Sequence, residues 1–230
     1  MIYGSGHNPQ KINEPSHILL ALLLVIFSAS LPVSAMAGSF PESESGKRPH
    51  LSSIWKTDAG SGFRKNIMDT GLTAGSGFGL DILGSKTSHQ LALVYGHMGW
   101  MATDVIFKNR WYEGNLELWG EIFAGRQYHP ETDSVFGLTF GPRYLFITHS
   151  RWVPFIDAGA GVSGTDIGEP DLSTKFEFNV QLGVGTHYFL MDNIALTLQV
   201  RGIHLSNAYI KLPNHGANAL LFLVGATYFF

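Results

Sequence analysis

The sequence predicts an all-β fold, an eight-stranded antiparallel transmembrane β-barrel of the outer-membrane type. Three observations predict it. An apolar run near the N-terminus has the pattern of an export signal, apolar and polar residues alternate along segments of strand length, and the chain ends on an aromatic strand. Beyond about residue 67 the sequence shows neither a helical period nor a long apolar run, so strands are favoured over helices.

The N-terminal residues predict three parts: a signal peptide over 1–37, a periplasmic lead-in over 38–66 and the barrel over 67–230. Lys11 precedes the apolar run HILLALLLVIF, and Ala35-Met36-Ala37 supplies the small residues of a cleavage site. A retained membrane anchor is the alternative, but the run is shorter than the ~20 residues that a spanning helix needs. The polar stretch before the run is long for a signal peptide, so Met1 need not be the true start.

The barrel segments follow one another as apolar and aromatic stretches, broken by clusters of Gly, Asp, Asn and Pro. Their lengths suit tilted strands that cross a membrane with roughly 9–11 residues in the hydrocarbon. An even number near eight gives the smallest closed barrel, with an interior filled by side chains. The expected strands are 69–82, 88–101, 113–126, 134–147, 151–163, 174–190, 192–206 and 217–230.

Side-chain parity within the sixth and seventh segments favours closure of the sheet. One face of the sixth carries Phe176, Phe178, Val180, Leu182, Val184 and Tyr188, and the other carries Glu177, Asn179, Gln181 and His187. The seventh opposes Ile194, Leu196, Leu198 and Val200 to Thr197, Gln199 and Arg201. Lipid outside and a polar, plugged lumen inside satisfy both faces. We expect inward charge pairs among Glu117, Glu121, Arg143, Asp157, Glu177 and Arg201, with a surface position as the alternative for Glu117 and Glu121.

The connections and the last strand agree with this architecture. With the N-terminus in the periplasm, the turns at 148–150 and 191–193 are short and the outer loops at 164–173 and 207–216 are longer, as in known barrels. The last strand places Leu220, Phe222, Val224, Ala226, Tyr228 and Phe230 on one parity. A terminal strand that ends on an aromatic residue is typical of bacterial outer-membrane proteins.

Composition excludes several other classes. The chain has no cysteine, which excludes disulfides, thiolate zinc sites and a cysteine nucleophile. A net charge of −3 without a basic stripe argues against a nucleic-acid partner. The glycine-rich GSGFGLDILG at 75–84 is no dinucleotide fingerprint because no helix follows it. Asp166, Glu169 and Asp171 share one outer loop, where solvation is favoured over a divalent cation, so neither metal nor cofactor is expected.

One segment, RGIHLSNAYIKLPNHGAN at 201–218, does not have the composition of barrel wall. His204 and Ser206 lie two residues apart at the upper end of the seventh strand, so both point to the same face. By the parity of the strand, that face is the lipid-facing one. Polar groups there are costly unless they are paired or lie at the interface, which indicates a functional site.

This segment resembles the signature of the outer-membrane lipid A 3-O-deacylases (the PagL family), which runs His-x-Ser-Asn-Ala, then Pro-Asn, then Gly and an acid. Over the rest of the chain the resemblance covers the architecture alone. It implies His204 as general base, Ser206 as nucleophile and Asn207 as an oxyanion-hole contributor, with Asn214 supporting the loop beneath them.

The chain departs from that signature at Asn218, where the family pattern has a Glu that orients the histidine. An amide oxygen can accept the imidazole N–H and fix the tautomer, but it cannot stabilise the imidazolium by charge. Three readings stay open: Asn218 suffices, another carboxylate helps, or activity is lost. We favour the first, and on sequence alone expect Asn218→Glu to retain or raise activity.

The resemblance implies a carboxylic ester hydrolase that removes the acyl chain at the 3-position of lipid A, a component of lipopolysaccharide, in the bacterial outer membrane. Lys211 could contact a lipid A phosphate, and a homodimer stays open. The rival hypothesis is a non-enzymatic structural or adhesion barrel of the OmpX type, or an inactive deacylase relative. A small-molecule channel fits less well because eight strands leave a filled lumen.

Overall fold

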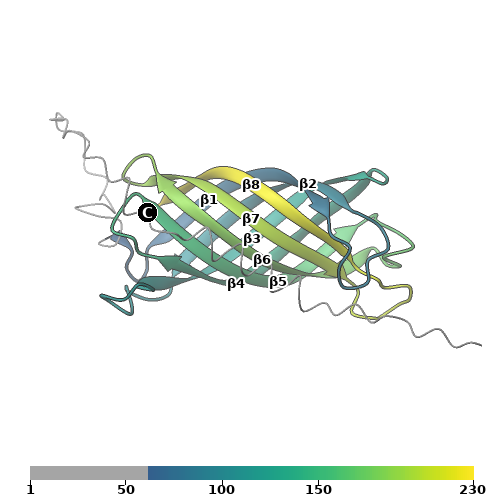
Figure 1. Ribbon diagram of the computed structural model, residues 1–230, viewed down its shortest axis with the longest axis horizontal. Helices are drawn as coiled ribbons and strands as arrows, with labels where there is room; N and C mark the ends of the chain where they lie inside the picture. Colours follow the sequence, from purple (N-terminus) through teal and green to yellow (C-terminus); the bar gives the residue numbers. More distant parts are fainter. Residues whose placement is uncertain (1–61) are drawn as a thin grey trace, which may run out of the picture. The chain divides into compact units, whose positions relative to one another are not determined.

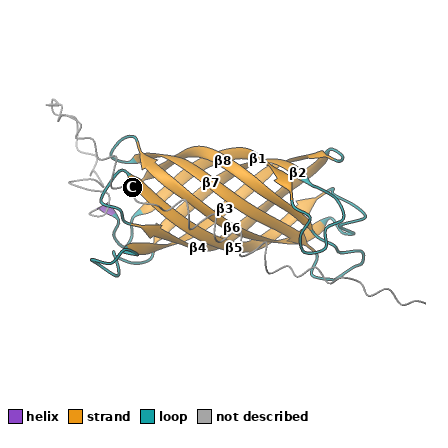
Figure 2. Ribbon diagram, in the orientation of Figure 1, coloured by secondary structure: helices purple, strands orange, loops and turns teal. Residues whose placement is uncertain are grey.

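The computed structural model describes residues 62–230, which form one closed antiparallel barrel in the strand order β1 to β8 (Figure 1, Figure 2). The proposed signal peptide and all but the last residues of the lead-in lie outside the described part of the chain. The strands are β1 (Met68–Gly79), β2 (Gln90–Met101), β3 (Gly114–His129), β4 (Asp133–Phe146), β5 (Trp152–Thr165), β6 (Phe176–Phe189), β7 (Ile194–Ser206) and β8 (Ala217–Phe229).

The barrel closes through pairing of β1 with β8, in a register that sets Asp69 opposite Phe229 and Gly79 opposite Ala219. The eight expected strands are confirmed, with two end points that differ by three residues and smaller differences elsewhere. The first strand stops at Gly79 and not at residue 82, because residues 80–89 form a loop whose Leu80 N–H bonds Asn218 O of β8. The third strand runs on to His129, which shortens the following connection to residues 130–132.

The connections divide into two sets at opposite ends of the barrel. We call the end that carries Met68 and Phe230 the terminal end, and the opposite end, with loops 80–89, 130–132, 166–175 and 207–216, the loop end. The expected contrast in length holds for the turns after β4 and β6 but fails twice. Residues 102–113 make a long connection at the terminal end, and residues 130–132 a short one at the loop end.

The outer wall is apolar around the barrel. Along β6 and β7 the exposed and buried positions alternate with the parity expected from the sequence. Large apolar side chains that are exposed on the wall include Leu72, Val94, Met98, Ile122, Phe140, Leu182, Phe222 and Val224. An outer surface of this kind, on a closed sheet without a free edge, suits a hydrocarbon environment. No helix within residues 62–230 is long and apolar enough to cross a membrane.

The lumen has three layers and is not uniformly polar as the sequence suggested. A central polar layer is enclosed by two apolar clusters, because inward strand positions near both ends carry apolar residues. Towards the loop end the cluster includes Leu93, Tyr95, Ile203 and Leu205. Towards the terminal end it includes Phe63, which precedes β1 and packs edge-on against Phe229 at 5.7 Å between ring centroids.

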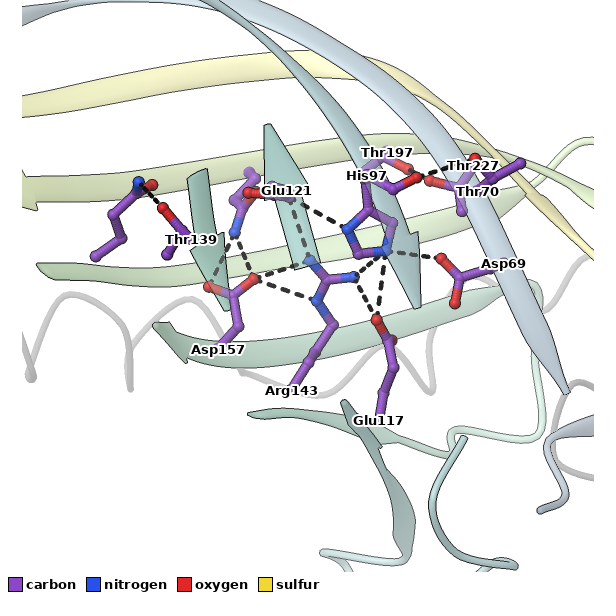
Figure 3. Close-up of polar contacts among 12 residues, drawn as sticks. Asp69, Thr70, His97, Glu117, Glu121, Thr139, Arg143, Asp157, Thr197 and Thr227 are labelled. Atoms are coloured by element: carbon purple, nitrogen blue, oxygen red, sulfur yellow. Dashed lines mark hydrogen bonds and ion pairs between the residues drawn. The ribbon is translucent and has the colours of Figure 1, made fainter. Parts of the chain in front are cut away.

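The polar layer is a buried ion-pair network centred on Arg143 and Arg201. Figure 3 shows the contacts around Arg143. Arg143 contacts Glu117 and Asp157, each at 3.1 Å. Arg201 pairs with Glu121, and its guanidinium also reaches Asp157 at 3.3 Å. The glycine at position 99 makes room for this layer, because a Cβ there would overlap carboxylate oxygens of the network. Glu117 and Glu121 therefore lie inside the barrel and not on a solvated surface.

One expected member of the network lies elsewhere. Glu177 is buried at the loop end of β6 and accepts a hydrogen bond from Thr174 Oγ1 at 2.6 Å. Within residues 62–230 it makes no ion pair, so the expectation of an inward charge pair at this position was wrong. Parity placed the side chain inside correctly. The reason for the failure is height along the barrel, since Glu177 is the second residue of β6 and the arginines lie deeper.

Candidate active site

His204 and Ser206 occupy the last outward positions of β7, at the loop end of the barrel wall. Both are partly exposed, while the alternate residues Ile203 and Leu205 are buried in the lumen cluster. This burial fixes the register of the strand end, since a shift by one residue would exchange the apolar and polar faces. His204 is paired with Val180 on β6 and with Asn218 on β8, and Ser206 is paired with Phe178.

The His204 ring is held by Asn218, which stands directly opposite on β8. The Nδ1 atom of His204 lies 2.7 Å from Oδ1 of Asn218. An amide oxygen only accepts, so Nδ1 carries the proton and donates, and Nε2 is left with its lone pair. The Asn218 side chain is 2% exposed, although its parity points it outward. Its Nδ2 donates to Ile82 O of the loop after β1, at 2.9 Å.

Gly216 allows the chain to pass close to the His204 ring. Its φ is +80°, in the region that favours glycine, and a Cβ there would lie 2.6 Å from His204 Cε1. The loop before β8 can therefore follow the imidazole only with glycine at this position. The sequence contained the residue but gave no sign of this contact.

Ser206 is free of hydrogen bonds to other side chains within the described residues, and the same part of the chain has no carboxylate within ion-pair distance of His204. Structures without substrate often leave the nucleophile and its base apart. The pair thus shares one face and one end of the wall, with the basic Nε2 of His204 not engaged by Asn218.

Asn207 and Asn214 stabilise the loop that follows Ser206. The backbone N–H of Asn207 donates to Asn214 Oδ1 at 3.0 Å. Its side-chain Nδ2 donates to Lys211 O at 2.9 Å and to Ser173 Oγ at 3.3 Å. The Asn214 side chain therefore supports loop 207–216 from within. The donors of Asn207 are used inside the loop, so an oxyanion contact from them would require one of these bonds to be exchanged.

A tight turn directly after Asn207 presents two further donors. The sequence led us to expect backbone N–H groups near Asn207 but did not indicate which residues supply them. Ile210 N–H bonds Asn207 O at 3.1 Å, and the two central residues, Ala208 and Tyr209, have φ values of +52° and +64°. Such values are uncommon outside glycine and often mark functional sites. Within residues 62–230 the N–H groups of Ala208 and Tyr209 make no hydrogen bond.

Asp171 joins three of the loops around the site. Its side chain, fully buried, accepts from Lys86 N–H at 2.6 Å and lies 2.9 Å from His89 Nε2. Its backbone carbonyl accepts from His215 N–H at 2.8 Å and Gly216 N–H at 3.2 Å. The loop carboxylates are therefore not gathered into a cation site, since Asp171 is committed to these bonds and Asp166 pairs with Lys175. Within the described residues the side chains of His215 and His204 share no hydrogen bond or ring contact.

The tip of loop 207–216 is apolar and exposed. Tyr209, Ile210 and Leu212 are at least 69% exposed, and Lys211 stands among them. A shallow hollow beside the site is lined by Tyr209, Leu212, Pro213, Asn214 and His215. Apolar side chains and one cation at the edge of a lipid-facing wall suit contact with an anionic amphiphile.

One cluster of metal-ligand type lies in the lumen, away from this site. Asp69, His97 and Glu117 bring three ligand atoms within 4.8 Å of one another. The guanidinium Nη1 of Arg143 lies 3.1 Å from both His97 Nε2 and Glu117 Oε1 (Figure 3). A positive group thus already fills the position that a cation would take, and the cluster belongs to the ion-pair network.

Comparison with known proteins gives consistent matches. The family model described as Lipid A 3-O-deacylase (PagL) matches residues 92–227. Lipid A deacylase PagL of Pseudomonas aeruginosa is 33% identical over 116 residues, which cover 47% of this chain and 65% of that protein. The chain thus aligns with just under two thirds of that relative's length.

Two solved structures are similar in fold. Neisserial surface protein A superposes with a TM-score of 0.52 at 14% identity, covering 71% of this chain and 97% of the other. The crystal structure of the outer membrane enzyme PagL gives 0.48 at 19% identity, covering 68% and 97%. The first likeness supports a barrel fold and carries no functional information at that identity.

Proposed function

Because the chain belongs to the lipid A 3-O-deacylase (PagL) family, we propose that it is an outer-membrane hydrolase that removes the ester-linked acyl chain at the 3-position of lipid A. The observation that carries the proposal is one small arrangement. Ser206 and His204 share the outer face of β7, and Asn218 orients the histidine with its Nε2 left free to accept a proton.

The position of these residues on the wall suits a lipid substrate. The site lies at the loop end of an apolar outer surface, just where β7 leaves the barrel. With the loop end outside the cell, this height corresponds to the interface of the outer leaflet, where the ester bonds of lipid A lie. The substrate would reach Ser206 by lateral diffusion in the membrane, without entering the filled lumen.

In the first step, Ser206 Oγ attacks the ester carbonyl while His204 Nε2 takes its proton. The tetrahedral intermediate collapses with transfer of that proton from His204 to the leaving sugar oxygen. The products of this step are the free 3-hydroxyl of the glucosamine and an acyl-Ser206 ester. Water, deprotonated by His204, then hydrolyses the acyl-Ser206 ester, releases the fatty acid and restores Ser206.

The oxyanion requires N–H donors close to Ser206. The turn that begins at Asn207 supplies unbonded backbone N–H groups at Ala208 and Tyr209, and we assign the oxyanion role to the Ala208 N–H first. Asn207 would contribute by holding the turn, through its bonds to Asn214 and Lys211. The two residues with left-handed φ values are those whose N–H groups make no hydrogen bond within the described residues.

The exposed tip of loop 207–216 would hold the substrate. The apolar hollow beside Tyr209 and Leu212 suits part of an acyl chain, and Lys211 suits a lipid A phosphate. The rival function is an inactive, structural barrel. It is favoured by the absence of a carboxylate near His204 within residues 62–230, and the experiment below separates the two.

Mass spectrometry of lipid A from cells that express the protein tests the proposal. We expect loss of the mass of one 3-hydroxyacyl chain, absent with Ser206→Ala. Ser76→Ala is the matched control, because Ser76 is an exposed serine on the outer wall of β1, away from His204. Unchanged lipid A, with the wild-type barrel folded in the outer membrane, would favour the inactive barrel. Activity that survives Ser206→Ala would exclude the serine mechanism.

A further inference from the structure

The amide of Asn218 has a different fixed partner on each side. Its oxygen faces His204 Nδ1 at 2.7 Å, and its nitrogen donates to Ile82 O at 2.9 Å. A backbone carbonyl can only accept, so the amide nitrogen must point to Ile82 and the amide oxygen must point to His204. The orientation of the amide, and with it the tautomer of His204, is therefore determined by a residue 136 positions away in the sequence.

The Ile82 carbonyl is itself held in place. It also accepts from Ser85 N–H at 3.2 Å, which closes a turn whose central residues, Leu83 and Gly84, have φ values of +54° and +95°. The loop is tied to β8 a second time, through the Leu80 N–H bond to Asn218 O at 3.0 Å. Loop 80–89 is thus attached to both the backbone and the side chain of Asn218.

We propose that the turn Ile82–Ser85 is a positioning element of the active site, and that its Ile82 carbonyl makes position 218 of this chain require an amide and not an acid. The inference rests on the proposed function for its meaning in catalysis. On this proposal Asn218 matches its two partners, and a carboxylate in its place would match only one of them. Loop 80–89 contains none of the proposed reacting groups, but on this proposal it positions one of them, His204, through Asn218.

An acid is disfavoured at position 218 because a carboxylate has no N–H to donate to the buried Ile82 carbonyl. Asn218 is 2% exposed, so water does not readily replace a lost partner. An Asp of nearly the same shape would still accept from His204, but its second oxygen would face the Ile82 carbonyl oxygen without a proton between them. Two acceptors in contact are repulsive, and a buried carboxylate without full pairing is costly. The side chain would turn away, and His204 would lose its fixed orientation.

The Ile82 carbonyl opposes the expectation drawn from the sequence alone, that Asn218→Glu would retain or raise activity. That expectation considered only the side of residue 218 that faces the histidine. The other side faces Ile82, and parity along β8 gives no information about a carbonyl in the loop after β1.

The test compares Asn218→Asp with Asn193→Asp in the full-length protein, purified in detergent and assayed on lipid A. Asn193 is the matched control because its Nδ2 donates to Phe229 O at 2.7 Å, so the same change removes the same kind of bond at the opposite end of the barrel. We expect Asn218→Asp to lower kcat by about tenfold to hundredfold with KM unchanged, and Asn193→Asp to leave kcat unchanged. Heat-modified migration on gels confirms that each barrel is folded.

A kcat for Asn218→Asp equal to or above wild type would overturn the inference. Nitrogen NMR of His204, assigned with His204→Gln, gives a readout that needs no activity. We expect a protonated Nδ1 in the wild type at a pH where the ring is neutral, and loss of that signature in Asn218→Asp. If the wild type fails to deacylate lipid A, the proposed function falls. The NMR result still decides the inference, which a protonated Nε2 in the wild type would overturn.

Discussion

At the scale of single residues, Gly216 has the closest link to the proposed chemistry among residues outside the reacting set. Its φ of +80° and the short approach to the His204 ring leave no room for a Cβ. We expect Gly216→Ala to displace the imidazole and lower kcat by about a hundredfold, since displacements near 1 Å have effects of that size. Kinetics on lipid A micelles would measure this.

Gly202→Ala is the control for this prediction. Gly202 lies on β7, two residues before His204, and a Cβ there would meet only Leu182 O, at 3.9 Å. Full activity of Gly202→Ala together with full activity of Gly216→Ala would show that the imidazole tolerates displacement, and the assigned role of Gly216 would be abandoned.

At the scale of elements, Asp171 joins three of the four loops at the loop end. It lies in loop 166–175 and bonds both loop 80–89 and loop 207–216. We expect Asp171→Ala to increase hydrogen exchange at the amide of Lys86, because that N–H loses its acceptor. The amides of His215 and Gly216 bond the carbonyl of residue 171, which the substitution retains, so their exchange rises only if the backbone at residue 171 moves. Each buried partner left unpaired costs about 1–3 kcal/mol, so local opening would rise by at least about fivefold. Exchange in the strands should not change.

Asp166→Ala serves as the comparison on the same loop. Its ion pair with Lys175 is exposed, and such pairs contribute about 0–1 kcal/mol. Equal exchange rates at Lys86 in both variants would mean that the Asp171 carboxylate does not hold loop 80–89.

At the scale of the whole molecule, a buried ion-pair layer fills the middle of the lumen, with Arg143 and its partners shown in Figure 3. Arg201 is fully buried and contacts Glu121 and Asp157, and its guanidinium lies 5.0 Å from the ring centre of Tyr95. We expect Arg201→Met to lower the free energy of unfolding by about 3–5 kcal/mol, because it leaves Glu121 without its main partner. Urea unfolding in lipid vesicles, followed by tryptophan fluorescence, measures the change.

The double variant Arg201→Met with Glu121→Leu tests the cause. Replacing both ions by apolar groups of similar volume restores much of the stability if the loss comes from an unpaired charge. If the double variant is as unstable as the single one, packing against Tyr95 and Trp119 is the dominant contribution of Arg201.

The sequence determined the strands, their number and the face that each side chain takes, because the period of two along a strand is a local pattern. It also brought His204 and Ser206 to one face at one end of β7, since two residues on one strand share a side. It indicated Asn218 beside them, because strand parity directs residue 218 outward across the last hairpin, and the register sets it opposite His204.

Only the tertiary structure decided what meets these residues from elsewhere in the chain. The Ile82 carbonyl, the Asp171 bonds and the packing of Phe63 in the lumen join segments that no local period relates. Height along the barrel separated Glu177 from the arginines in the same way, since it depends on the tilt and closure of all eight strands. Parity gives the direction of a side chain, whereas its partners depend on how the whole sheet closes.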